Sequence, residues 1–107
     1  MSHGLSGETV DRIRGVLAQF PEVEKAVLYG SRAKGDYKRG SDIDLALIGN
    51  DLNASVLSKI NNALDDLPLP YKIDPSILRK ISHTDLLDHI RRVGAIFYEK
   101  QAETVQR

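Results

Sequence analysis

The sequence predicts an α/β (α+β) fold, a small mixed β-sheet flanked by helices, and three observations support this prediction. Apolar residues recur at helical spacing in three segments of the chain. Three other segments are short and apolar, as strands are. Glycine and proline separate these segments, so we expect a single domain over residues 1–107, with its core at about 8–98 and polar tails at both ends.

The first half of the chain is predicted to form a helix, a strand, a loop and a second strand. Ser6 can cap a helix that runs to about Gln19. The inward-facing stripe of this helix consists of Val10, Ile13, Leu17 and Phe20. A strand is then expected at Val23–Tyr29, followed by a loop with one helical turn between Arg32 and Ser41. The second strand ends at about Ile48, where a glycine follows.

A second helix and a short third strand are predicted next. Either Asp51 or Asn53 can cap the helix. Its apolar positions are Val56, Leu57, Ile60 and Leu64. The third strand is expected at Tyr71–Asp74, with Pro75 ending it because proline cannot donate to a sheet ladder.

The last predicted elements are a helix and an additional strand. The sequence Ser82-His83-Thr84-Asp85 is typical of a capping box, which opens a helix. The inward positions of this helix are Leu86, Leu87, Ile90 and Val93. Gly94 is expected to end it, and Ala95–Tyr98 then forms a strand. The histidines have no ligand spacing, and we interpret all of them as structural or surface residues; they are His3, His83 and His89.

Composition narrows the function classes. The chain is 41% hydrophobic and 28% charged with a formal net charge of zero, which argues against a protein that coats long nucleic acid. It contains no cysteine, which favours a reducing, cytoplasmic location and excludes thiolate metal sites. No apolar run approaches the ~20 residues of a membrane-spanning helix, and residues 1–7 do not resemble a signal peptide.

The most informative feature is a pair of aspartates at the start of the second predicted strand. Asp42 and Asp44 are separated by one residue, so a strand places both carboxylates on one face with their Cα atoms roughly 6.6 Å apart. Such a pair can hold metal ions about 3.5–4 Å apart, as in phosphoryl and nucleotidyl transfer, and oxygen ligands suit Mg²⁺. The alternative is a solvated strand edge. We favour the metal site, because apolar residues 45–48 follow at once and a partly buried acidic pair is costly without a cation.

A glycine-serine turn precedes the aspartates. Gly30 lets the backbone approach a phosphate closely, and Ser31 offers a hydroxyl and, at a helix start, backbone amides. Arg32 and Lys34 can stabilise phosphate charge. A plain turn is the alternative for Gly30-Ser31, and Arg32 fits a soluble loop equally well. The nearby basic residues Lys38 and Arg39 fit a soluble loop better.

These residues together resemble the polymerase-β-type nucleotidyltransferase superfamily. Within it, Gly-Ser-Arg-Ala-Lys-Gly at 30–35 and Ser-Asp-Ile-Asp-Leu at 41–45 resemble the minimal nucleotidyltransferases, many of which are antitoxins of HEPN-domain toxins. The resemblance implies a polymerase-β-like fold, ATP as substrate and two Mg²⁺ ions. It implies that Asp74 is a third carboxylate, which binds metal or removes the proton of the acceptor hydroxyl. The alternative for Asp74 is a turn opener before Pro75.

The function implied by this resemblance is transfer of AMP from ATP to a hydroxyl, with a tyrosine of a partner HEPN toxin as the expected acceptor. Two alternatives stay open: a non-catalytic nucleotide-binding protein that neutralises its partner by occlusion, and transfer to a small molecule such as an aminoglycoside. The sequence leaves the acceptor, the nucleotide, the number of transfers and homo-oligomerisation open. A template-directed polymerase is disfavoured by the neutral charge.

Overall fold

The computed structural model of the protein describes residues 3–38 and 40–100. Its elements, in chain order, are α1 (Gly7–Ala18), β1 (Lys25–Tyr29), α2 (Ser31–Lys34), β2 (Ile43–Ile48), α3 (Ala54–Asp65), β3 (Ile73–Ile77), a 3₁₀ turn η1 (Leu78–Lys80), α4 (Thr84–Val93) and β4 (Ala95–Glu99). The strands form one mixed sheet in the order β3-β2-β1-β4. Strand β1 is antiparallel to β2 and β4, and β3 is parallel to β2. The predicted mixed sheet with flanking helices is therefore confirmed.

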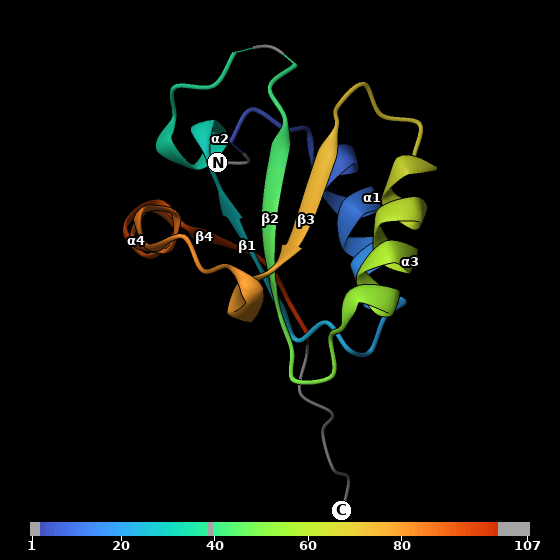
Figure 1. Cartoon of the computed structure of the whole chain (residues 1–107). Coiled ribbons are helices and arrows are strands. Elements are labelled where there is room, and N and C mark those ends of the chain that lie inside the picture. Colours follow the sequence, from blue (N-terminus) through green and yellow to red (C-terminus); the bar gives the residue numbers. More distant parts are fainter. Residues whose placement is uncertain (1–2, 39, 101–107) are drawn as a thin grey trace, which may run out of the picture.

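The helices divide between the two faces of the sheet. α1 and α3 cover one face, and α4 lies against the other (Figure 1). In β2, Ile43, Leu45 and Leu47 join the larger core under α1 and α3, whereas Ala46 packs in a smaller cluster that includes Ile90 of α4. Because strand side chains alternate, Asp44 projects from the same face as Ala46, toward the α4 side.

The helix starts follow the predicted caps in two cases and depart from them in one. The Ser6 hydroxyl accepts a hydrogen bond from the Thr9 amide at 3.1 Å, and the Asn53 side chain accepts one from Val56 at 2.9 Å. At α4, however, the Nδ1 of His83 accepts from the Leu86 amide at 3.2 Å. The cap is thus His83 rather than Ser82, because an imidazole nitrogen without a proton accepts as a hydroxyl oxygen does.

The prediction that Pro75 ends the third strand was wrong. β3 begins at Ile73 and continues through Pro75 to Ile77. β3 lies at the edge of the sheet, where one side of the strand faces no neighbour. A proline whose missing N–H falls on that side costs no ladder hydrogen bond. Asp74 is consequently the second residue of a strand and is paired along its backbone with β2.

The prediction of a strand after Gly94 is confirmed by β4, which occupies the opposite edge of the sheet. Within residues 3–38 and 40–100, no helix has the length and apolar character needed to cross a bilayer. Arg39 and the polar tail at residues 101–107 lie outside the described residues, so the expectations for them stay predictions.

Candidate active site

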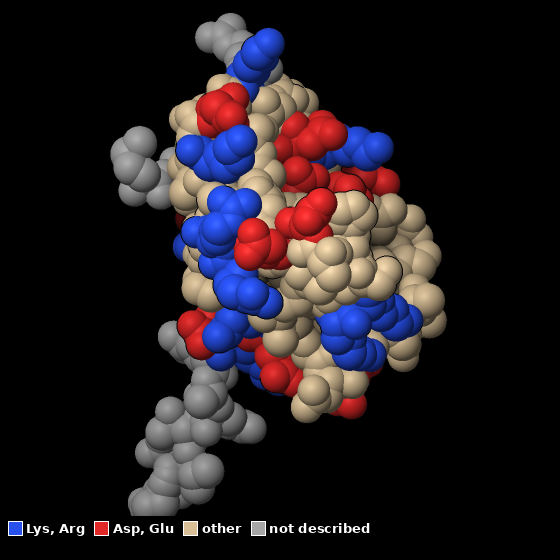
Figure 2. All heavy atoms as spheres, turned by 60° about the vertical axis from the view of Figure 1, so that its left-hand side comes forward, with Lys and Arg blue, Asp and Glu red and all other residues tan. Residues whose placement is uncertain are grey.

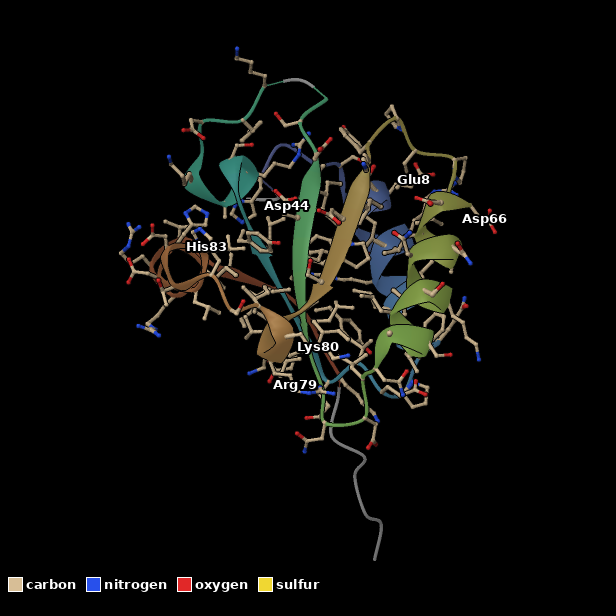
Figure 3. The ribbon with its side chains drawn as sticks, in the orientation of Figure 1. Glu8, Asp44, Asp66, Arg79, Lys80 and His83 are labelled. Atoms are coloured by element: carbon tan, nitrogen blue, oxygen red, sulfur yellow. The ribbon has the colours of Figure 1, made fainter. Side chains whose placement is uncertain are left out.

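A row of three polar side chains crosses the sheet at its α2 end. Tyr29 at the end of β1 is the antiparallel partner of Asp44, and Asp44 is the parallel partner of Asp74 near the start of β3. Backbone partners in adjacent strands project from the same face, so these side chains lie side by side on the α4 face. Figure 3 labels Asp44 near the start of β2, and the row is built around it.

Asp42 lies just before β2 and is exposed, as is Asp74, whereas Asp44 is partly buried. The acids are close enough to interact. Burial, followed by the charges of Asp74 and Asp42, raises the pKa of Asp44, and His89 opposes this rise. An acidic group whose pKa rises next to other carboxylates lies in a site that favours an added positive charge.

The pKa of Tyr29 is also shifted by burial and by the charges of the neighbouring aspartates. Burial raises the pKa of its phenol, and the charges of Asp44 and Asp74 raise it further, while a hydrogen bond with Ser76 acts in the opposite direction. The Tyr29 side chain is 8% exposed. It therefore stays a neutral phenol at the floor of the site and contributes no charge to it.

Gly30 connects β1 to α2 and touches Asp44. Its φ of 84° and ψ of −157° fall in a region that is essentially restricted to glycine. A Cβ at this position would collide with the Oδ2 of Asp44. The absence of a side chain at residue 30 is thus required twice, by the backbone conformation and by the approach of the carboxylate.

The predicted helical turn in the glycine-containing loop is confirmed as α2. The amides of Lys34 and Gly35 donate to the carbonyls of Gly30 and Ser31, which closes one turn. Ser31 is the first residue of this turn. It directly follows Gly30, which is next to Asp44 in the aspartate row. The Nζ of Lys34 is 3.4 Å from a carboxylate oxygen of Asp36, and both side chains are at least half exposed. Roles for Ser31 and Lys34 with a nucleotide remain predictions.

The structure does not place Arg32 where a nucleotide could meet it. Its side chain is 2% exposed. Its Nε donates to the Ser41 carbonyl at 3.1 Å and its Nη1 to the His3 carbonyl at 3.0 Å. The guanidinium carbon lies 5.1 Å and 4.9 Å from the ring centroids of Tyr37 and Tyr71. Because carbonyl oxygens and aromatic faces replace water around the cation, Arg32 has a structural role in this arrangement.

Loss of Arg32 should therefore destabilise the fold. Arg32→Met leaves the carbonyls of Ser41 and His3 without their donor, and we expect a loss of about 2–3 kcal/mol in the free energy of unfolding, measured in urea. Arg12→Met is the matched control, since Arg12 forms an exposed pair with Glu8 and should cost less than about 0.5 kcal/mol. Equal stability of the two variants would contradict the structural role of Arg32.

The carboxylates of the site suit Mg²⁺ only in part. Among the residues that the structure describes, no three acidic or histidine side chains converge closely enough to enclose a metal ion by themselves. Mg²⁺ usually takes only one or two carboxylates and completes its shell with water and substrate phosphates. Asp44 and Asp74 share one face, and the charges of Asp42 and Asp74 both act on Asp44, so the donor set fits an ion that arrives with a nucleotide.

Two residues of the site were not predicted from the sequence. His89 of α4 lies beside the site, where its Nε2 accepts a hydrogen bond from the Gly30 amide at 3.0 Å. Tyr29 was predicted only as the end of a strand. Neither has a motif around it, and each is brought to the site by tertiary packing: α4 against β1 for His89, and strand register for Tyr29.

The sequence pattern of the family described as polymerase beta, nucleotidyltransferase matches residues 11–103, so the chain belongs to that family and is a nucleotidyltransferase. It is 28% identical to the probable protein adenylyltransferase MntA of Haemophilus influenzae over 104 residues, which cover 96% of this chain and 90% of that protein. A crystal structure of a toxin-antitoxin with AMP-PNP contains a chain with 26% identity and a TM-score of 0.69, over 86% of this chain and 74% of the other.

The fold is also similar to a chain in a structure of a tri-AMPylated Shewanella oneidensis HEPN toxin in complex with its MNT antitoxin. The TM-score is 0.58 at 23% identity, over 87% of this chain and 71% of that chain. At this identity the similarity supports the fold alone.

Proposed function

We propose that this protein is a Mg²⁺-dependent adenylyltransferase that moves AMP from ATP to a tyrosine hydroxyl of a HEPN-type helical toxin and so acts as its antitoxin. The observation that carries this proposal is the alignment of Asp44 with Asp74 across two parallel strands, with Asp42 just ahead of them and the Gly30 turn against Asp44. Carboxylates on one face beside a sharp glycine turn are suited to a metal-bound triphosphate.

In the proposed reaction the acceptor hydroxyl oxygen attacks the α-phosphorus of ATP. A new P–O bond forms, the bond between the α-phosphorus and the bridging oxygen breaks, and pyrophosphate leaves. The hydroxyl proton passes to a base, for which Asp74 is suited because its carboxylate is exposed at the sheet edge. Asp42 and Asp44 would hold Mg²⁺, which supplies charge that stabilises the transferring phosphoryl group and the leaving pyrophosphate.

The surface around the site is compatible with a charged substrate although the whole chain has a net charge of zero. Figure 2 shows Lys and Arg side chains in a band on the face toward α4, with Asp and Glu side chains beside them. Lys34 of α2 is exposed near the turn and lies beside Asp36, and in the proposed function its ammonium group exchanges this partner for triphosphate oxygens.

Similarity to known proteins supports a protein, rather than a small molecule, as the acceptor of the AMP group. The Haemophilus influenzae relative is named a probable protein adenylyltransferase, and the neighbouring structures include a toxin-antitoxin with AMP-PNP, which is a nonhydrolysable ATP analogue. The exposure of Asp42 and Asp74 leaves the site open to a side chain of another protein.

The proposal is tested by the mass of a purified HEPN-type toxin after incubation with this protein, ATP and Mg²⁺. We expect a gain of one or more AMP units, and no gain with the variant Asp42→Asn/Asp44→Asn. Asp11→Asn is the matched control, since Asp11 is exposed on α1, which covers the opposite face of the sheet, and it should label the toxin normally. A tight complex with unchanged toxin mass would instead indicate neutralisation by occlusion, and labelling by the double variant would contradict the assigned carboxylates.

A further inference from the structure

We propose that His89 is a positioning residue that holds the Gly30-Ser31 turn in the conformation that receives the triphosphate. This inference rests on the proposed nucleotide site. His89 lies on α4, 59 residues from Gly30 in the sequence, and its Nε2 accepts the Gly30 N–H at 3.0 Å. The bond joins a helix that supplies none of the site's carboxylates to the turn between β1 and α2.

The imidazole contacts the Tyr29 ring, and its helix is anchored to the sheet by the neighbouring residue. Its ring meets the Tyr29 ring edge to face, with centroids 6.3 Å apart and planes at 77°. The next residue, Ile90, is 7% exposed and packs with Tyr29 and Ala46 in the cluster that fixes α4 on the sheet. The acceptor nitrogen is therefore fixed relative to β1, which ends at the turn that it contacts.

The turn needs such an anchor because glycine is conformationally free. Glycine reaches a φ of 84° and ψ of −157° without strain, but it reaches other conformations as readily, so residue 30 does not fix the turn by itself. A hydrogen bond to a fixed acceptor selects this conformation over the others. It also orients the peptide plane before Gly30, so the direction in which Ser31 leaves the turn depends on His89.

The Asp44 carboxylate occupies the space that a Cβ of residue 30 would fill, so the turn held by His89 lies next to the central carboxylate. Without the hydrogen bond the turn can relax away from the carboxylate row. We then expect the triphosphate to bind less well while all three carboxylates are retained. The effect should fall on nucleotide affinity and on KM for ATP rather than on kcat.

The experiment compares His89→Leu, which removes the acceptor, with His89→Gln, whose side-chain oxygen can take the place of Nε2. Affinity for AMP-PNP with Mg²⁺ is measured by calorimetry without any acceptor protein. We expect His89→Leu to bind about tenfold more weakly, and His89→Gln to stay within about threefold of the unchanged protein. His83→Leu is the matched control, because it removes the cap of the same helix without touching the turn; it should lower the melting temperature and leave the affinity unchanged.

The inference is overturned if His89→Leu binds AMP-PNP as well as the unchanged protein, if His89→Gln is as weak as His89→Leu, or if His83→Leu weakens binding equally. Should His89→Leu not fold, His89→Asn replaces it, since its shorter side chain is polar but does not reach the position of Nε2. Because binding is measured without an acceptor, a failure of adenylyl transfer to the toxin would count against the proposed function and not against His89.

Discussion

Replacing Asp44 with asparagine is expected to abolish nucleotidyl transfer while it stabilises the fold. Asp44 is the central member of the aspartate row, so under the proposed function its loss removes a metal ligand from the middle of the site, and we expect the rate of toxin labelling to fall about 10³-fold or more. Without metal, however, the same carboxylate is partly buried and repelled by Asp42 and Asp74. Neutralising it should raise the free energy of unfolding at pH 7.

The pH dependence of this gain in the free energy of unfolding follows from the raised pKa of Asp44. The folded protein holds the Asp44 proton more tightly than the unfolded chain, in which the group titrates near 3.8. Between these two pKa values the native state binds more protons, so the stability of the unchanged protein falls as the pH rises through the folded pKa and is constant above it. The advantage of Asp44→Asn should thus be full at pH 7 and absent below about pH 3.8.

The measurement is urea unfolding of both proteins in EDTA as a function of pH, with Asp11→Asn on the opposite side of the sheet as the control that should change neither stability nor labelling. Addition of Mg²⁺ together with AMP-PNP should stabilise the unchanged protein and not Asp44→Asn, because only the former keeps the proposed ligand. If Asp44→Asn is less stable than the unchanged protein at pH 7, then burial of the Asp44 charge and its repulsion by Asp42 and Asp74 do not destabilise the metal-free fold.

The parts of the fold that follow from local patterns were predictable. The alternation of residues 42–48 in the sequence predicts Asp42 and Asp44 on one side. The structure puts Asp44 on the α4 face, while β2 buries Ile43, Leu45 and Leu47 on the other. The cap at Ser6 and one of the two alternatives for the next helix, Asn53, are local hydrogen bonds that short sequence patterns specify.

Some features depend on where a strand or helix lies in the whole molecule. These features were not predictable from the sequence. The rule that proline ends a strand is wrong for Pro75, because β3 is an edge strand, and edge position is a property of the sheet. The sequence left Arg32 open between a phosphate ligand and a soluble loop residue, whereas the structure buries it between Tyr37 and Tyr71, and that packing is tertiary. His89 reaches Gly30 only because α4 packs on β1.

The second large effect is expected for Gly30→Ala. The added methyl group should lower the stability of the fold in two separable ways. The first is conformational, since an alanine at a φ of 84° and ψ of −157° is strained by about 1–3 kcal/mol. The second is steric, since the new Cβ meets the Oδ2 of Asp44. Together we expect a loss of about 3 kcal/mol or more in the free energy of unfolding and a loss of Mg²⁺-dependent AMP-PNP binding.

Two control variants separate these costs. Gly35→Ala tests the milder case of an αL backbone without a steric clash, because Gly35 has a φ of 93° and a ψ of 0° and, apart from its chain neighbours, no atom within 4 Å of the place where its Cβ would lie. It should cost about 1–2 kcal/mol. In an Asp44→Ala background, Gly30→Ala should lose most of its steric cost, so the double-mutant cycle should give a coupling of about 1 kcal/mol or more between the two positions. Additive effects would mean that the turn and the carboxylate do not touch, and the close approach on which the site is built would then be wrong.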